Sequence, residues 1–274
     1  MEDKSMLITI EGLDGSGKTT TVNKLKEIFS GDDVLITKEP YDSHWLGKQV
    51  RDALSDSSVS PISTLLLFMS DYTYHYTNVV KPALESGHTV ISDRYIGSRC
   101  AYQGHSIVDE GNAVDFVQSL HYDVSWQLDT TDDTYLDYVG YAKENMPADM
   151  YHYTPPLGRY FYGASQLIEA ELLPTGVSTP TELLPALKRL ETTQRNEHQP
   201  DITVYLDANV ETCIERIGNR TSTEKFEYAE FLAPVKENYE YMIDTDPEQF
   251  IVIDSEQPIE KMEQEISQKI ADVL

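Results

Sequence analysis

A phosphate-binding pattern lies near the start of the chain, where residues 12–19 have the sequence GLDGSGKT and fit G-x-x-x-x-G-K-[ST]. The glycines allow successive backbone N–H groups to converge on phosphate oxygens, and the helix that follows favours an anion at its N-terminus. Lys18 would neutralise charge between the β- and γ-phosphates, and the Thr19 hydroxyl would ligate Mg²⁺. The residues expected to bind a nucleoside triphosphate at this loop are Gly12, Asp14, Gly15, Ser16, Gly17, Lys18, Thr19 and Thr20.

Short runs rich in branched apolar residues are typical of buried β-strands. The expected strands are Leu7–Glu11, Val34–Thr37, Thr89–Ser92, Ile202–Asp207 and Phe250–Ile253. Because these runs do not alternate with polar residues and are separated by helical stretches, they indicate a parallel sheet covered on both faces. The expected helices include Lys18–Phe29, Pro61–Leu84 and Ala229–Ile243. The pattern predicts an α/β fold with a doubly wound, five-stranded parallel sheet of the P-loop NTPase type.

One long stretch does not fit this sheet. Between His105 and about Pro185 no clear strand is recognisable, while prolines and tyrosines recur. So many aromatic residues argue against disorder, which depends on low hydrophobicity. We therefore expect a core formed by residues 1–104 and 186–274, interrupted at residues 105–185 by an inserted, mostly helical, tyrosine-rich lobe. The lobe could cap the binding site, make a dimer contact or bind another molecule.

The charge of the chain is unusual, because 47 acidic residues stand against 21 basic ones and give a formal net charge of −26. Such a charge repels a phosphate backbone and argues against a nucleic-acid polymer as partner. Self-repulsion destabilises a compact state unless salt screens it, so we expect a halophilic protein in a salt-rich cytoplasm, although an ordinary acidic protein remains the alternative. No apolar run approaches the ~20 residues that span a bilayer, and the N-terminus lacks a signal peptide, so no membrane partner is expected. Cys100 and Cys213 lack metal-ligand spacing and are expected to be small buried groups.

Six segments occur in an order that resembles the thymidylate kinase family, most closely its haloarchaeal and haloviral members. They are EGLDGSGKTT (11–20), KEP (38–40), LLLFMSD (65–71), ISDRYIGSRCAYQG (91–104), PDITVYLD (200–207) and KFEYAEFLAPVKENY (225–239). The resemblance covers most of the chain outside the insertion. It implies a nucleoside monophosphate kinase that transfers the γ-phosphoryl group of ATP to dTMP, with Mg²⁺ as cofactor and a homodimer as the assembly.

The resemblance also assigns residues to the acceptor phosphate. Two anionic phosphates must be brought together against their repulsion, which requires arginines. Arg94 is expected to bridge the acceptor phosphate and the transferring group, and Arg51 to bind the acceptor phosphate. Asp93 is expected to hold Mg²⁺ through water. Asp14 is expected to contact the sugar 3′-hydroxyl, while Glu39 would orient the acceptor or a metal-bound water, or simply end a turn.

The same resemblance assigns residues to the sugar and base of the acceptor. Phe68 is expected to stack on thymine, although it also fits a plain core helix. Gln103 is expected to form a hydrogen bond with the edge of the base, and Tyr102 to disfavour a 2′-hydroxyl. Tyr72 stands where many members have an arginine that donates to a thymine carbonyl, and we hypothesise that Arg99 supplies the missing donor. The whole set expected to bind the acceptor is Asp14, Glu39, Arg51, Phe68, Tyr72, Arg94, Ser98, Arg99, Tyr102 and Gln103.

Residues 213–228 resemble the lid that closes over ATP. The phosphate loop contains no basic residue besides Lys18, and in that case the family places catalytic cations in the lid. The resemblance thus implies that Arg220 and Lys225 act with Lys18, Asp93 and Arg94 in catalysis. Arg216 would stack against the adenine of ATP. Arg216 and Arg220 also lie four residues apart and fit an ordinary helix surface.

Two further functions remain open at this point. The chain could phosphorylate another deoxynucleoside monophosphate, or several of them. It could also be a regulatory module that binds a nucleotide without catalysis, although the complete set of reactive residues argues against this.

Overall fold

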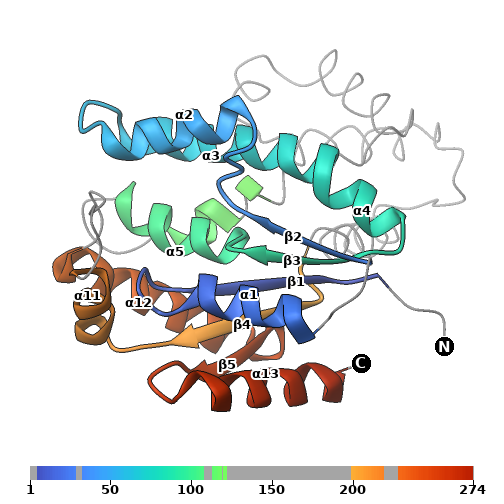
Figure 1. The fold of residues 1–274 in the computed structure, drawn as a ribbon. Helices are drawn as coiled ribbons and strands as arrows, with labels where there is room; N and C mark the ends of the chain where they lie inside the picture. Colours follow the sequence, from blue (N-terminus) through green and yellow to red (C-terminus); the bar gives the residue numbers. More distant parts are fainter. Residues whose placement is uncertain are drawn as a thin grey trace, which may run out of the picture. The chain divides into compact units, whose positions relative to one another are not determined.

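The computed structural model describes residues 5–28, 33–107, 113–118, 120–121, 199–218 and 228–273. Within these residues the chain forms a five-stranded, wholly parallel sheet in the order β2-β3-β1-β4-β5 (Figure 1). The strands are β1 (Leu7–Gly12), β2 (Val34–Lys38), β3 (Thr89–Asp93), β4 (Ile202–Asp207) and β5 (Phe250–Asp254). The predicted doubly wound α/β fold is confirmed. All five strands begin at the predicted residue, and four of them end one residue later than predicted.

Helices connect the strands and cover the sheet. They are α1 (Lys18–Ile28), α2 (Trp45–Ser55), α3 (Pro61–His75), η1 (Tyr76–Val80), α4 (Lys81–Glu85), α5 (Ile96–Ser106), α11 (Val210–Gly218), α12 (Ala229–Thr245), η2 (Pro247–Gln249) and α13 (Ile259–Val273). The predicted helix 61–84 thus consists of three consecutive segments, because the π-helical turn η1 joins α3 to α4.

The two faces of the sheet have different helical covers. On one face α1 and α13 pack against each other (Figure 1) and enclose the aliphatic core. This core includes Ile8 and Ile10 of β1, Val204 and Leu206 of β4, and Ile266 of α13. Burying each such side chain stabilises the fold by about 1.5–3 kcal/mol. On the other face α5 and α12 pack together, and the residues of β1 and β4 that alternate with these aliphatic ones point toward them.

The chain divides into two compact units, residues 1–118 with 200–274 and residues 119–199. The five strands and the active-site residues around them all belong to the first unit. The interior of the lobe predicted at residues 105–185, with its tyrosines, lies outside the described residues, and so does the predicted lid from residue 219 to 227. Both cysteines are free and buried in helices, as predicted. In the part of the chain that the structure describes, no helix is both long and apolar enough to cross a bilayer.

Candidate active site

The loop between β1 and α1 has the backbone that its glycines predict. Gly12, Gly15 and Gly17 all adopt positive φ angles, of 143°, 85° and 101°. A side chain at Gly15 would meet the carbonyl oxygen of Cys213 at 2.5 Å from its Cβ, so glycine is needed there for packing as well as for conformation. The loop leads directly into α1, whose N-terminus faces the cavity above the loop. This arrangement can bind a chain of phosphates.

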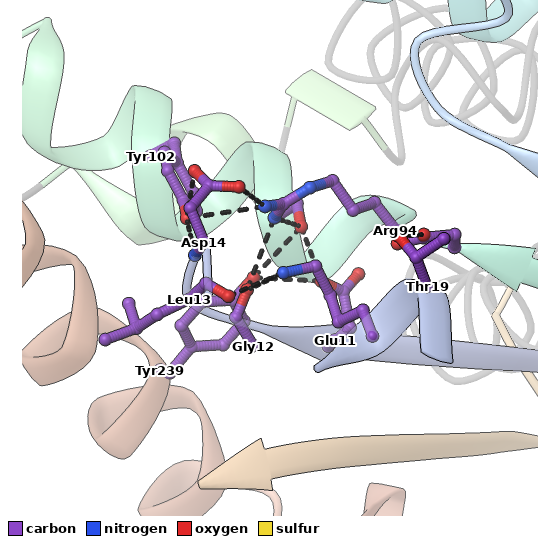
Figure 2. A network of polar contacts seen from close by, with 11 residues as sticks. Glu11, Gly12, Leu13, Asp14, Thr19, Arg94, Tyr102 and Tyr239 are labelled. Carbon is purple, nitrogen blue, oxygen red and sulfur yellow. Dashed lines mark hydrogen bonds and ion pairs between the residues drawn. The ribbon is translucent and has the colours of Figure 1, made fainter. Parts of the chain in front are cut away.

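The ammonium group of Lys18 lies inside this loop. Its Nζ donates hydrogen bonds to the carbonyl oxygens of Gly12 and Leu13 at 3.0 and 2.6 Å (Figure 2). Burial, followed by the positive charge of Arg94, lowers the pKa of Lys18 to about 8, although Asp14, Asp93 and Glu11 act to raise it. A bound triphosphate would place anionic oxygens beside the ammonium group and restore a high pKa.

The lowered pKa of Lys18 makes triphosphate affinity sensitive to pH. Between pH 7 and 9 the free protein loses the Lys18 proton, and the complex keeps it. We therefore expect ATP affinity to fall across this range and binding at pH 8 to take up roughly half a proton. Calorimetry in buffers of different ionisation enthalpy measures both effects. Lys18→Arg keeps its charge at these pH values and should abolish the proton uptake. An ATP affinity of the parent protein that stays constant from pH 7 to 9 would contradict the contact between Lys18 and the triphosphate.

Thr19 and Asp93, the two residues predicted to hold Mg²⁺, lie together where the loop meets the end of β3. The Thr19 hydroxyl donates a hydrogen bond to Asp93 Oδ2 at 2.9 Å, and both side chains line the cavity above the loop. The described residues contain no cluster of three or more His, Cys, Asp or Glu side chains that could enclose a metal. One hydroxyl and one carboxylate suit Mg²⁺, which keeps several waters and takes its other ligands from substrate phosphates. Thr19 would therefore ligate the ion directly, and Asp93 would hold it through water.

Arg94 follows β3 and projects over the loop from a left-handed backbone conformation, with φ of 74°. The Arg94 backbone N–H donates to Ile10 O at 3.0 Å, which fixes the end of the strand. The guanidinium donates to Gly12 O at 3.3 Å, to Ser98 Oγ at 2.8 Å and to Asp14 Oδ1 at 2.5 Å (Figure 2). Non-glycine residues rarely adopt this backbone conformation, and they do so most often at functional sites.

Asp14 and Tyr102 complete the surroundings of Arg94. The Tyr102 hydroxyl donates to Asp14 Oδ2 at 2.9 Å, and the Arg94 guanidinium lies 5.0 Å from the centre of the Tyr102 ring. Burial acts to raise the pKa of Asp14, but the charges of Arg94 and Lys18 and the hydrogen bonds of Tyr102 and Arg94 outweigh it, so that the pKa falls to about 2. Asp14 is therefore ionised and can accept a hydrogen bond from a hydroxyl.

Two adjoining cavities open at the carboxyl ends of the strands, where doubly wound folds place their ligands. The phosphate cavity is lined by Asp14, Gly15, Gly17, Lys18, Thr19, Thr20, Lys38, Glu39, Arg51, Asp93 and Arg94. The acceptor pocket is lined by Asp14, Glu39, Pro40, Arg51, Leu54, Phe68, Arg94, Tyr95, Ser98, Arg99, Tyr102 and Gln103. Asp14, Glu39, Arg51 and Arg94 line both, so two phosphorylated ligands could meet between these four side chains.

Comparisons with known proteins agree with this geometry. The family described as "Thymidylate kinase" matches residues 10–137 and 183–266 of the chain. The chain belongs to the thymidylate kinase family. It is therefore a nucleoside monophosphate kinase. A probable thymidylate kinase of Halobacterium salinarum is 33% identical over 270 residues, which cover 98% of this chain and 97% of the relative.

Two other relatives bear the same description, probable thymidylate kinase. That of Natronomonas pharaonis is 31% identical over 255 residues, 92% of this chain and 90% of the relative. That of Methanosarcina mazei is 28% identical over 277 residues, 99% of this chain and 98% of the relative. The predicted resemblance to haloarchaeal thymidylate kinases is thus confirmed. The family match omits residues 138–182, yet these relatives align over nearly their whole length, so a chain of this size is not peculiar to this protein.

The acceptor pocket departs from the usual thymidylate kinase pattern at Arg99 and Tyr72, and the structure shows how the two are related. Arg99 lines the pocket with a buried guanidinium that pairs with Glu39 through Nη1 and Oε2. Tyr72 is fully buried behind it, with its ring centre 4.6 Å from the guanidinium carbon. Tyr72 is not among the residues that line the pocket, but it contacts two that do, Arg99 and Tyr95.

Arg51 and Phe68 both line the acceptor pocket. Arg51 extends from α2, and its Nε donates to Asp42 Oδ1 at 3.2 Å. Lys38, which sequence reasoning did not single out, pairs with the same Asp42 and lines the phosphate cavity. Phe68 lies half-buried on α3 and lines the pocket, and its stacking on a base stays a prediction. Lys38 could have been added to the candidate residues from its position alone, because it ends β2 directly before Glu39.

Of the three basic residues assigned to the lid, Arg216 lies in the part of the chain that the structure describes. This side chain lies beneath the phosphate loop, where its guanidinium donates to Gly15 O at 3.3 Å and to Ser255 O at 3.0 Å. Arg216 thereby connects the phosphate loop with the segment after β5. Stacking on adenine stays a prediction. Arg220 and Lys225 lie outside the described residues. Among the loop residues, Ser16 is buried next to Gly12 rather than lining the cavity.

Proposed function

We propose that this protein catalyses transfer of the γ-phosphoryl group of ATP to dTMP, giving ADP and dTDP. The observation that carries the proposal is that the phosphate cavity and the acceptor pocket share the same four side chains. ATP would occupy the phosphate cavity with Mg²⁺ at Thr19 and Asp93. The monophosphate of dTMP would enter from the acceptor pocket between Arg51 and Arg94.

The reaction needs positioning more than proton transfer. An anionic oxygen of the dTMP phosphate attacks the γ-phosphorus, and the bond to the β–γ bridging oxygen breaks as ADP leaves. Because the attacking oxygen carries no proton, no general base is required. Arg94 and Lys18 would stabilise the charge on the transferring group, and each well-placed donor of this kind contributes about 3–4 kcal/mol. Mg²⁺, when bound, supplies further charge neutralisation. We further propose that Arg220 and Lys225 complete this set when a lid closes over ATP.

Arg99 is proposed to recognise the base. Its position beside Phe68 and Gln103 in the acceptor pocket would let the guanidinium donate to a carbonyl oxygen of thymine, in place of the arginine that many thymidylate kinases have at the position of Tyr72. Glu39 fixes the guanidinium in this orientation. Tyr102 and Asp14 would contact the deoxyribose.

The experiment that tests the proposed function measures ADP release with ATP–Mg²⁺ and each of dTMP, dUMP, dCMP, dGMP and dAMP. We expect a strong preference for dTMP. A broad or shifted preference would leave the phosphoryl transfer intact but would overturn the substrate assignment, in favour of a deoxynucleoside monophosphate kinase of different specificity. Absence of ADP release with every acceptor, in a protein that binds ATP, would favour a non-catalytic nucleotide-binding module instead.

We also propose that the protein works in a salt-rich cytoplasm. The motivation is the net charge of −26, since acidic side chains in this number repel one another where salt is dilute. The dTMP assay and thermal unfolding should both show a gain from dilute buffer to molar KCl. Equal activity and an equal Tm at the two salt concentrations would contradict this proposal.

A homodimer is the proposed assembly, as in the family. In support, α2 and α3 expose the large apolar side chains of Trp45, Ile62 and Leu66, which are 61%, 44% and 54% accessible. Ile62 and Leu66 lie one turn apart on α3, and exposed apolar residues of this size are typical of a protein interface. Sedimentation equilibrium in molar salt would decide between monomer and dimer.

A further inference from the structure

Glu11 is a buried carboxylate next to the active site to which neither the phosphate loop motif nor the family match gives a role. It precedes Gly12 near the end of β1, and its side chain is inaccessible to solvent. It points away from the aliphatic core, toward α5 and α12. A buried carboxylate is costly unless its oxygens accept hydrogen bonds or meet a positive charge. The hydrogen-bond partners of Glu11 therefore indicate which part of the structure the buried carboxylate holds in place.

Three groups donate hydrogen bonds to the Glu11 carboxylate. The backbone N–H of Tyr95 donates to Oε1 at 2.8 Å, while the hydroxyls of Ser98 and Tyr239 donate to Oε2 at 2.6 and 2.9 Å. Gly97 makes this approach possible, because a Cβ there would lie 2.9 Å from the carboxyl carbon. The carboxylate thus ties β1 to the first turn of α5 and to the middle of α12.

The Ser98 hydroxyl connects Glu11 to Arg94. A hydroxyl has one hydrogen, and the short contact with Glu11 takes it. The lone pairs of Ser98 Oγ then remain available to Arg94 Nη1, which donates to this oxygen at 2.8 Å (Figure 2). An ionised carboxylate accepts but cannot donate, so Glu11 fixes the direction of both hydrogen bonds. The guanidinium is consequently held between Ser98 on one side and Asp14 on the other.

We propose that Glu11 is a positioning residue for phosphoryl transfer, which orients Arg94 through Ser98 toward the junction of the two cavities. The inference rests on the proposed function only in requiring an acceptor phosphate at that junction. It does not depend on the base, because Arg94 would meet phosphates and not the nucleobase. Tyr239 donates to the same carboxylate oxygen, and its hydroxyl also lies 3.0 Å from Ser98 Oγ. Because the hydrogens of both hydroxyls go to Glu11, Tyr239→Phe takes no hydrogen bond from Ser98 or Arg94, which makes it a matched control.

The test compares Glu11→Gln, Ser98→Ala, Tyr239→Phe and the Glu11→Gln/Ser98→Ala double variant. An amide at position 11 loses the charge and offers a donor in place of an acceptor, so the Ser98 hydroxyl is no longer forced to point at it. We expect kcat of Glu11→Gln to fall roughly ten- to hundredfold, since a misplacement of about 1 Å in a reacting group can cost about 10²-fold. Because the Glu11 charge helps to keep Lys18 protonated, the variants are compared at pH 7, below the pKa of Lys18. There KM for ATP should change little, because the loop glycines and Thr19 are untouched.

The matched control separates positioning from simple loss of a buried hydrogen bond. Tyr239→Phe removes one donor from the same carboxylate oxygen and should lower Tm while leaving kcat nearly unchanged. Because Glu11 acts through Ser98, the double variant should lose no more kcat than the more impaired single variant. Thermal unfolding of all four variants ensures that kcat is measured on folded protein.

Three outcomes would overturn the inference. They are a Glu11→Gln variant whose kcat matches the parent, a Tyr239→Phe variant that loses as much kcat as Glu11→Gln, and losses that multiply in the double variant. Failure of the substrate assignment is distinguishable from these. If the parent protein prefers another monophosphate to dTMP, the same four variants are compared on that acceptor, and the relation between their kcat values still decides the role of Glu11.

Discussion

Replacement of Arg94 by alanine is expected to lower kcat for dTMP phosphorylation by roughly 10³-fold or more, as found for arginines that stabilise a transferring phosphoryl group. Arg94 lies where the phosphate cavity meets the acceptor pocket, and its guanidinium is aimed by Gly12, Ser98 and Asp14. Its removal withdraws the positive charge from the point where two anionic phosphates must approach. It also leaves the Asp14 carboxylate less compensated, which adds repulsion at that point.

Arg94→Lys is the matched variant for this prediction. A lysine retains the charge, but its single ammonium group cannot reproduce a planar fork that contacts several acceptors at once. We therefore expect Arg94→Lys to recover little of the kcat that is lost in Arg94→Ala. Arg51→Ala provides the contrast, because Arg51 would bind the acceptor phosphate equally in the ground state and the transition state, so that the KM for dTMP rises more than kcat falls. Steady-state kinetics measures both constants. An Arg94→Ala variant within tenfold of the parent kcat would contradict the assignment.

The elements that could be predicted from sequence are those with local causes. The glycines at positions 12, 15 and 17 impose the loop conformation by themselves, and the branched apolar runs define strands that agree with prediction to within one residue. Asp93 ends β3 and Arg94 follows it, so both could be placed at the edge of the sheet that must face the ligand. These positions need only neighbouring residues and the general geometry of parallel sheets, whereas the roles of the two side chains were implied by the family resemblance.

The features that escaped prediction depend on partners far along the chain. Glu11 obtains its hydrogen bonds from residues 84, 87 and 228 positions away, which lie in or directly before helices whose rotation about their axes the sequence does not specify. The pairing of Arg99 with Glu39 spans 60 positions. The sequence indicated that Arg99 and Tyr72 are unusual, but it could not show that one lies against the other. Burial of a charged side chain is the signal that only the folded structure provides.

Arg99 gives the second large expected effect, which concerns stability as well as recognition. The side chains of Arg99 and Glu39 are only 2% and 3% accessible. Burial acts to lower the pKa of Arg99, yet the Glu39 charge raises it overall, so the guanidinium remains charged. Arg99→Ala would leave Glu39 buried without this partner, and breaking such a pair costs about 3–5 kcal/mol. We expect the variant to unfold at a markedly lower temperature than the parent.

A double variant separates recognition from stability. Arg99→Met with Glu39→Gln removes both charges and retains much of the side-chain volume, and such replacements of buried pairs are often neutral in stability. If Arg99 donates to the base, the double variant should fold well and yet show a KM for dTMP raised roughly 10- to 100-fold, the equivalent of a hydrogen bond from a charged group worth about 1.5–3 kcal/mol. Cys100→Ala, which alters the neighbouring buried residue on α5, controls for general disturbance of the helix.

The two variants together distinguish the possible roles of Arg99. A destabilised Arg99→Ala together with a stable double variant of unchanged KM would make Arg99 a structural partner of Glu39, and recognition of thymine would then fall to Gln103 and Phe68. A KM raised in the stable double variant well beyond that of Glu39→Gln alone would show that the guanidinium contacts the base, since Glu39 itself lines both cavities. If the contact is to the C4 carbonyl, the loss should be largest for dTMP and dUMP, which have a carbonyl there. It should be smaller for dCMP, because the amino group at C4 of cytosine cannot accept a hydrogen bond from Arg99.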